Sequence, residues 1–159
     1  MDGGAEQLET NYTAKLTPVT EGEWAGWFCY PGGDPFEDHA GPFYWTKDAE
    51  GRPRCAFRAE RKHMNGGGFL HGGCVMTFAD FSLFWLAREA IEGQSSVTAT
   101  FNAELVGTCG VGDLVECRGE VVKAGRSMVF LRGLIVNASA GGAPMMSFSS
   151  VLKKTTRRA

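Results

Sequence analysis

The segment from residue 70 to residue 93 constrains the fold of this chain more than any other. It contains no proline, is rich in strong helix formers and ends in Glu92-Gly93, so it predicts one long helix. Apolar side chains occupy nearly its whole circumference, at Val75, Met76, Phe78, Ala79, Phe81, Leu83, Phe84, Trp85 and Leu86. A helix that is apolar all round is buried on most sides. The rest of the chain must therefore wrap around it.

Runs of β-prone residues flank the predicted helix on both sides. Two runs precede it, at residues 41–47 and 54–62, and others follow at residues 96–106, 113–122, 127–138 and 144–153. The turns between the later runs are short enough for an antiparallel meander. A helix segregated from an antiparallel sheet predicts the α+β class, with a curved sheet around a single central helix.

The length of the chain, 159 residues, suits one main domain. We assign residues 41–154 to this domain and residues 155–159 to a basic tail. Residues 1–40 form an N-terminal extension, in which residues 21–30 predict a short amphipathic helix with Trp24, Trp27 and Phe28 on one face.

Charge and composition exclude several functions. The net charge is -2 and the pI is near 5.9, without the basic excess that nucleic-acid binding requires. The most apolar stretch, residues 74–87, is too short and too polar to span a membrane, and the start of the chain lacks the pattern of a secretory signal. The five cysteines form no C-x-x-C pair, so we expect reduced thiols and a cytoplasmic protein.

A glycine-rich loop with the sequence HMNGGGFLHGG, residues 63–73, leads into the predicted helix. A helix N-terminus presents free N–H groups and about half a positive charge, and glycines let a ligand approach the backbone. Such a helix start can serve as an oxyanion hole. Asp80 follows among apolar neighbours, where an ionised carboxylate is costly. Asp80 lies either on a narrow wet stripe with Thr77 and Arg88, or beside a polarised carbonyl as a base or nucleophile.

The spacing between Gly72 and Asp80 adds a geometric constraint. Eight positions of one helix correspond to about 12 Å along its axis, too far for both residues to touch the same carbonyl. If both serve one reaction centre, Asp80 must come from a second copy whose helix runs antiparallel. This predicts a two-fold dimer with two equivalent sites.

The spacing N-x5-H-G-G-x6-D, formed by Asn65, residues 71–73 and Asp80, resembles the signature of the hotdog-fold acyl-CoA thioesterases of the phenylacetate-degradation (PaaI-like) type. The resemblance covers about residues 41–153, including VTATFN at residues 97–102 and VGD at residues 111–113. It implies a hotdog fold, with a curved sheet around one helix, and a homodimer that usually doubles into a tetramer. It further implies hydrolysis of an acyl-CoA thioester without a cofactor.

The resemblance also implies roles for individual residues. Asp80 activates water as a general base or attacks as a nucleophile, and the Gly72 N–H, helped by Gly73, binds the thioester oxygen. Asn65 matches a position that helps to hold the carbonyl or the water. Thr98 matches a position where the family often carries a hydroxyl near the carboxylate.

Other residues are candidates for substrate binding. We expect His71 to order the loop or the helix start by hydrogen bonding. Phe81, with Met76, Phe84 and Trp85, lines the acyl pocket or belongs to the core. Coenzyme A carries phosphates, for which Arg126 is a candidate cation, together with Lys123 and the basic residues of 153–158.

The sequence also bears on several other functions. The spacing of His39, His63, His71 and Asp80 fits no common zinc template, so no metal is expected, and no nucleotide-phosphate loop is present. Cys74 near the helix start is read as a small buried residue rather than a nucleophile. A hotdog hydratase or dehydratase would use a catalytic His, which the predicted helix lacks. A non-catalytic acyl-CoA-binding protein remains the other alternative. The acyl group, aromatic or medium-chain, stays open.

Overall fold

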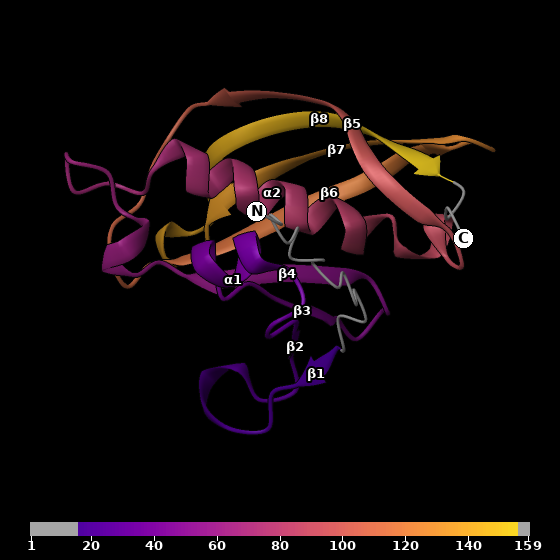
Figure 1. Ribbon diagram of the computed structural model, residues 1–159. Helices are drawn as coiled ribbons and strands as arrows, with labels where there is room; N and C mark the ends of the chain where they lie inside the picture. The colour runs from indigo at the N-terminus through magenta and orange to yellow at the C-terminus, as the bar shows by residue number, and fades with distance from the viewer. Residues whose placement is uncertain (1–15, 156–159) are drawn as a thin grey trace, which may run out of the picture.

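The structure, a computed structural model, describes residues 16–155 (Figure 1). In chain order its main elements are β1 (Thr17–Pro18), β2 (Phe28–Cys29), α1 (Pro35–Ala40), β3 (Tyr44–Lys47), β4 (Pro53–Arg58), α2 (Gly72–Leu86), β5 (Ser95–Leu105), β6 (Leu114–Ala124), β7 (Met128–Asn137) and β8 (Ala143–Thr155). Short 3-10 turns lie at Gly22–Trp24, Arg61–His63, Arg88–Ile91 and Ala138–Ala140. In this part of the chain no helix is both long and apolar enough to cross a membrane.

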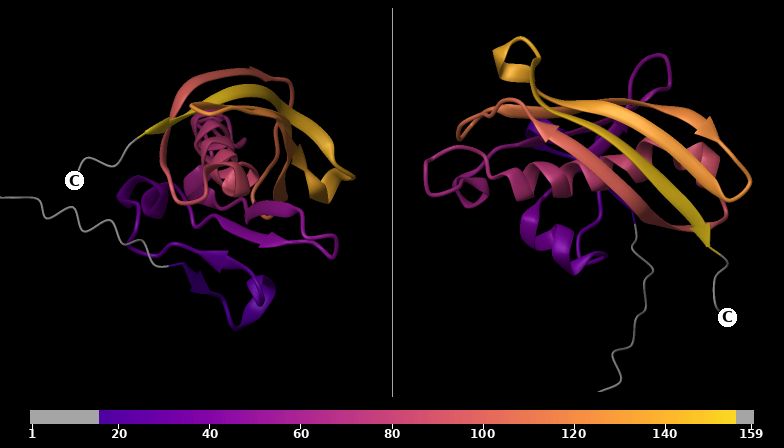
Figure 2. Two further views of the ribbon diagram at one scale, coloured as in Figure 1. Left: turned by 90° about the vertical axis from the view of Figure 1, so that its right-hand side faces the viewer. Right: turned by 90° about the horizontal axis from the view of Figure 1, so that it is seen from above.

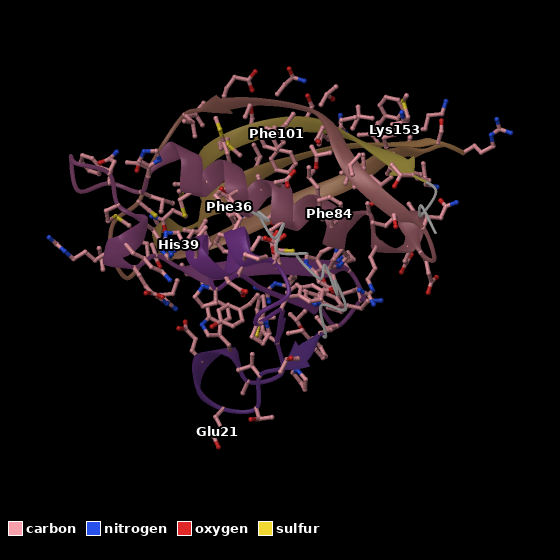
Figure 3. The ribbon with its side chains drawn as sticks, in the orientation of Figure 1. Glu21, Phe36, His39, Phe84, Phe101 and Lys153 are labelled. Atoms are coloured by element: carbon pink, nitrogen blue, oxygen red, sulfur yellow. The ribbon has the colours of Figure 1, made fainter. Side chains whose placement is uncertain are left out.

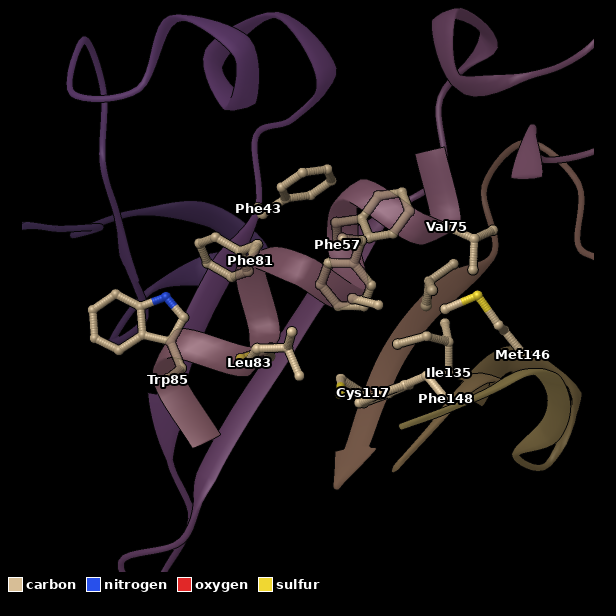
Figure 4. Close-up of a cluster of buried hydrophobic side chains, with 14 of the residues drawn as sticks. Phe43, Phe57, Val75, Phe81, Leu83, Trp85, Cys117, Ile135, Met146 and Phe148 are labelled. Atoms are coloured by element: carbon tan, nitrogen blue, oxygen red, sulfur yellow. The ribbon is translucent and has the colours of Figure 1, made fainter. Parts of the chain in front are cut away.

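The long helix α2 lies in the concave face of the sheet, which confirms the predicted α+β arrangement. Figure 2 shows α2 nearly end-on, with β5 to β8 curving around it. Phe78 and Leu83 of α2 are fully buried against sheet residues such as Phe57 and Ile135, and Figure 4 shows part of this core. The helix is shorter than the predicted span, because a 3-10 turn at Arg88–Ile91 replaces its last part.

One stripe of α2 is less buried than the rest. It consists of Gly73, Met76, Thr77, Asp80 and Phe84, spaced three or four residues apart, as one face of a helix requires. Met76 is 41% exposed, whereas Phe78 and Ala79 on the opposite face are fully buried. Asp80 and Thr77 thus share a partly exposed stripe, which we call the α2 stripe. Arg88, which the sequence analysis placed on it, lies beyond the end of α2 and stacks on Trp45 and Trp85 instead.

The antiparallel sheet has 8 strands in the order β1-β2-β3-β4-β6-β7-β8-β5. Strands β6, β7 and β8 form the predicted meander. The prediction that β5 belongs to it next to β6 was wrong, because β5 pairs with β8 at the far edge of the sheet, with Phe101 opposite Ser150. The position next to β6 is taken by β4, with Cys55 opposite Cys117.

The connection from β5 to β6 is short because the sheet curls around the start of α2. Residues 106–113 pass close to the loop that precedes the helix, where the Leu70 N–H donates to the Cys109 carbonyl over 3.0 Å. A short connection can therefore link strands that are not neighbours, so the length of the turn alone did not identify the partner of β5.

The predicted aromatic helix at residues 21–30 was wrong. Gly22 and Gly26 have φ values of 74° and 85°, in the left-handed region, so the chain turns twice within this segment. The segment forms a 3-10 turn and then β2, which pairs with β1 and β3. Trp24 stacks on Tyr44, with the ring centroids 4.3 Å apart, and thereby covers the outer part of the sheet.

The N-terminal extension does contain a helix, the short α1 at Pro35–Ala40, which lies beyond the predicted one. The Asp34 carboxylate accepts hydrogen bonds from the N–H groups of Phe36 and Glu37, at 3.1 and 3.0 Å, and Pro35 stands at the first helical position. An Asp N-cap followed by Pro is a favoured way to start a helix. This helix packs against α2, as Figure 1 shows.

Candidate active site

Asp80 and Thr98 form a hydrogen-bonded pair between α2 and β5. The Thr98 hydroxyl donates to Asp80 Oδ1 over 2.6 Å, and both residues are half-buried. Burial raises the pKa of Asp80, the hydrogen bond from Thr98 opposes this rise, and the nearby charge of Asp34 adds to it. The structure thus brings together the carboxylate and the hydroxyl that the resemblance had matched to family positions.

A local irregularity of β5 lies beside this pair. The pairing of β5 with β8 shifts register between Thr98 and Thr100, which lie opposite Leu152 and Val151. Bulges of this kind bend a strand and re-aim a side chain, and they are common next to active sites. Thr98 lies at this register shift, and its hydroxyl donates a hydrogen bond to Asp80.

The start of α2 is capped by His71, which confirms the predicted ordering role. His71 Nδ1 accepts a hydrogen bond from the Gly73 N–H over 2.9 Å. Gly72 is the first helical residue, so no carbonyl of α2 can accept its N–H. A Cβ at Gly72 would lie 2.8 Å from Leu105 Cδ1, which leaves room only for glycine unless Leu105 moves. Within one chain, therefore, Gly72 offers a free backbone donor, whereas Gly73 is occupied by its cap.

Asn65 organises the glycine-rich loop. Its Oδ1 accepts hydrogen bonds from the N–H groups of Gly67 and Phe69, at 2.8 and 3.2 Å. The Asn65 side chain is exposed, and its amide nitrogen makes no hydrogen bond to the described residues. The oxygen fixes the loop, and the nitrogen is available to a ligand.

A groove between α1 and α2 connects the helix start with Asp80. One part of it, near the start of α2, is lined by Lys62, His63, His71, Gly73 and Cys74, among others. The second part, around Asp80, is lined by Asp34, Phe36, Glu37, Met76, Thr77, Asp80 and Phe101. Phe36 and Thr77 line both parts, and Figure 3 labels Phe36 on α1 and Phe101 on β5, close to α2.

Two residues of this groove were missed by the sequence analysis. Glu37 belongs to α1, and the signal that could have found this helix is the Asp34-Pro35 pair. Lys62 places a cation near the start of α2, at the end of a run that was expected to be a strand but closes in a 3-10 turn at Arg61–His63.

Two of the predicted binding residues lie outside the groove within one chain. Phe81 is 3% exposed and packs against Phe43, with ring centroids 5.5 Å apart, so it is a core residue and does not line the hollow at Asp80. The reason is helical geometry, since consecutive residues point about 100° apart. Arg126 lies in the exposed turn after β6, whose 11 residues lead about 36 Å away from the helix start.

The described residues hold no group of three or more His, Cys, Asp or Glu side chains that could bind a metal ion. Burial raises the pKa of Cys74 to about 11, so this side chain is a neutral thiol near pH 7. Burial also lowers the pKa of His63, whose Nδ1 accepts from the Glu60 N–H over 2.9 Å. Cys74 is therefore not prepared for nucleophilic chemistry, and His63 is used in the turn before the glycine-rich loop.

Known proteins match the part of this chain that contains α2, the helix of the candidate site. The model of the thioesterase superfamily matches residues 67–142, which contain α2 and β5 to β7. A curated protein of Pseudomonas aeruginosa, "Putative esterase PA0474", is 36% identical over 97 residues, which are 60% of this chain and 72% of that protein.

Solved structures show the same fold at lower identity. The BH2602 protein of Bacillus halodurans, determined with CoA, gives a TM-score of 0.65 at 19% identity, over 72% of this chain and 74% of that one. A hypothetical thioesterase of Streptococcus pneumoniae with coenzyme A gives 0.63 at 20% identity, over 74% and 88%. The PaaI protein of E. coli gives 0.59 at 16% identity, over 65% and 72%. These similarities confirm the predicted hotdog fold.

Proposed function

The chain belongs to the thioesterase superfamily, and we propose that it hydrolyses the thioester bond of an acyl-CoA to a free acid and coenzyme A. The observation that carries this proposal is the half-buried carboxylate of Asp80, held by the Thr98 hydroxyl at 2.6 Å in a groove that begins at the glycine start of α2. The CoA found with the proteins of similar fold from B. halodurans and S. pneumoniae supports the choice of thioester.

The proposed reaction combines the helix start of one chain with Asp80 of a second copy. Attack on the thioester places negative charge on the carbonyl oxygen, and the Gly72 N–H at the positive end of α2 stabilises this charge by about 3 kcal/mol. Asp80 accepts the proton of the attacking water, or attacks the carbonyl itself to form an anhydride that water then hydrolyses. Partial burial raises the pKa of Asp80, which makes its carboxylate a stronger base than an exposed one.

A second copy of the chain completes the proposed site. Gly72 and Asp80 of one helix are about 12 Å apart along its axis, so each serves a carbonyl with its counterpart from the partner. Strand β5 lies at the edge of the described sheet, with one side unpaired, and Val97 on it is 51% exposed. An exposed apolar edge of this length favours pairing with another chain.

We also propose that two of these dimers associate into a tetramer. It rests on apolar side chains of β6 and β7 that are exposed on the sheet, namely Val122, Met128, Phe130 and Leu134. Exposed apolar patches of this kind are typical of subunit contacts.

The substrate is proposed to carry an aromatic or medium-chain acyl group. Phe36, Met76 and Phe101 give the hollow at Asp80 an apolar lining that accepts either. Lys62 is the cation near the start of α2 that could hold a CoA phosphate. Arg126 lies far from the start of α2 in its own chain, so it would contact a CoA phosphate bound there only from another subunit. Five free cysteines fit a protein of the reducing cytoplasm.

The test is thiol release from aromatic and straight-chain acyl-CoA esters by the parent and by Asp80→Asn, with Glu89→Gln as the matched exposed control. We expect turnover by the parent and the control, and a loss of at least about a hundredfold in Asp80→Asn. Binding of acyl-CoA without thiol release would replace this proposal by a non-catalytic binding protein. Consumption of an enoyl-CoA without thiol release would indicate a hydratase instead.

A further inference from the structure

We propose that Glu37 of α1 is a second catalytic carboxyl group of this site, which protonates the leaving thiolate of coenzyme A. The inference rests on the proposed thioester hydrolysis and adds a residue to it. It assigns a chemical role to the N-terminal extension, which lies outside the residues matched by the superfamily model.

The position of Glu37 is fixed by the start of α1. The Asp34 carboxylate accepts from the Glu37 N–H over 3.0 Å, and the Glu37 carbonyl accepts from the Gly41 N–H at the end of the helix. Glu37 is half-buried and lines the same hollow as Asp80. Two carboxyl groups, from α1 and from α2, therefore face one reaction space.

The surroundings of this hollow are apolar or acidic. Besides Asp80 and Glu37, its wall consists of Asp34, Phe36, Met76, Thr77 and Phe101, and no Lys, Arg or His lines it. On its other side Glu37 borders a smaller cavity with Cys29, Tyr30 and Asp38. Among the residues that the structure describes, the side chains that line these two hollows with Glu37 are thus neutral or negative, and its ionised form is favoured only by the positive end of the short helix α1.

The two carboxyl groups are consequently separated in acidity. Burial, and then the charges of Asp34, Asp80 and Asp38, raise the pKa of Glu37 to about 7. The pKa of Asp80 is raised too, but the Thr98 hydroxyl donates to it and favours its ionised form. When two neighbouring acids differ in this way, one acts as the base and the other as the acid. Near neutral pH, Glu37 therefore holds a proton in about half of the molecules, whereas the Thr98 hydrogen bond favours Asp80 as the carboxylate.

The proton balance closes over one turnover. Asp80 takes a proton from water as the water oxygen bonds to the carbonyl carbon. The tetrahedral oxyanion then collapses, the carbon–sulfur bond breaks, and the thiolate receives the proton of Glu37. The products are the carboxylic acid and the thiol, and transfer of the proton from Asp80 to Glu37 restores both groups. No oxidant, reductant or metal enters the cycle.

The test compares two substrates on one variant, Glu37→Gln. The first is the best acyl-CoA from the panel, and the second is the same acyl group on nitrothiophenol, whose acidic thiol leaves without protonation. We expect Glu37→Gln to lose about a hundredfold in kcat on the CoA ester and little on the aryl ester. The fall of kcat with pH above about 7 in the parent should disappear in the variant.

The matched control is Glu89→Gln, an exposed carboxylate that lines neither of the two hollows at Glu37, which should leave both activities unchanged. Because both substrates are measured on one preparation, a partly folded variant loses both activities equally. Equal losses, or an unchanged pH profile, would overturn the role of Glu37. A parent that releases no thiol would instead overturn the proposed hydrolysis, and an Asp80→Asn protein of full activity would overturn the role of Asp80 in it.

Discussion

The Thr98 hydroxyl controls the acidity of Asp80. It donates to Asp80 Oδ1 over 2.6 Å, and a hydrogen bond to a carboxylate favours the charged form. Without it, burial and the charge of Asp34 raise the pKa of Asp80 unopposed. We therefore expect Thr98→Val to move the acid limb of kcat/KM to higher pH by about one unit. Measured pH profiles of the two proteins test this, with Thr98→Ser, which keeps the hydroxyl, as control.

The direction of this shift follows from the role of Asp80. In the role proposed for it, Asp80 acts only when it is ionised, so activity should rise as the pH passes its pKa. A higher pKa moves that rise to higher pH, and at alkaline pH the Thr98→Val protein approaches parental activity. A uniform loss at every pH would show that Thr98 only shapes the strand.

Glu37 should link stability to pH. Its pKa rises from 4.5 to about 7 in the folded protein, so the folded state holds a proton that the unfolded state has lost in this window. Stability from this group is therefore full below about pH 4.5 and declines up to about pH 7. The upper limit is about 3 kcal/mol, which solvent screening of a partly exposed carboxyl reduces to about 1–2 kcal/mol.

We accordingly expect Glu37→Gln to be more stable than the parent at about pH 8 and close to it at about pH 4, below both pKa values. Urea unfolding of both proteins at the two pH values measures the difference, in which the contributions of all other groups cancel. The same gain at both pH values would contradict the pKa argument.

Single residues of the site were predictable to different degrees. Asp80, Gly72 and His71 stand in one short motif, and the apolar neighbours of Asp80 mark it as unusual. Thr98 was matched through the resemblance alone, because a Thr in a strand carries no chemical signal of its own. Glu37 could not be found from the motif, since its role depends on α1 folding back onto α2.

At the level of elements, α1 depends on its cap. Replacing Asp34 by Ala removes the acceptor for the N–H groups of Phe36 and Glu37, which should cost about 0.5–2 kcal/mol. Asp34→Asn keeps an acceptor oxygen and should cost less. Urea unfolding and the hydrogen exchange of the α1 amides measure the two effects. Equal behaviour of both variants would show that the charge of Asp34, rather than its cap, holds the helix.

The strands and the long helix were predictable because their patterns are local. Alternation of apolar residues located β6, β7 and β8 to within a few residues, and the apolar run located α2. Two errors had physical causes beyond local pattern. The glycines at 22 and 26 adopt positive φ and break the aromatic segment, and the curvature of the sheet lets β5 pair at the opposite edge.

At the level of the whole molecule, the two-copy site predicts complementation between inactive variants. Gly72→Pro removes the backbone donor, and proline suits the first helical position after the extended His71. We expect it to lose about 10²–10³ in kcat, as an oxyanion donor should. Unfolding it together with Asp80→Asn and refolding the mixture should restore about a quarter of parental activity, because half the dimers are mixed and each holds one intact site.

The control is Gly72→Ala, which keeps the N–H but makes the same close contact with Leu105. If it is as inactive as Gly72→Pro, the contact and not the donor matters. Light scattering establishes that the refolded species are dimers or tetramers. Activity that stays at the level of the separate variants would place Gly72 and Asp80 at unrelated sites.

The whole-molecule arrangement was the part least open to prediction from single residues. That a sheet must wrap α2 followed from its apolar circumference. The sequence did not predict that α1 forms a wall of the groove beside Asp80, because no sequence pattern links the N-terminal extension to α2.

The pairing of β5 with β8 has a consequence for synthesis on the ribosome. Thr98 is held by a strand that is translated after β6 and β7, so a nascent chain that has completed α2 and β5 still lacks the support of its Asp80–Thr98 pair. Elements with distant partners form late, once those partners are available. Catalytic competence therefore arrives with β8, and an unfinished chain leaves the thioesters of the cell untouched.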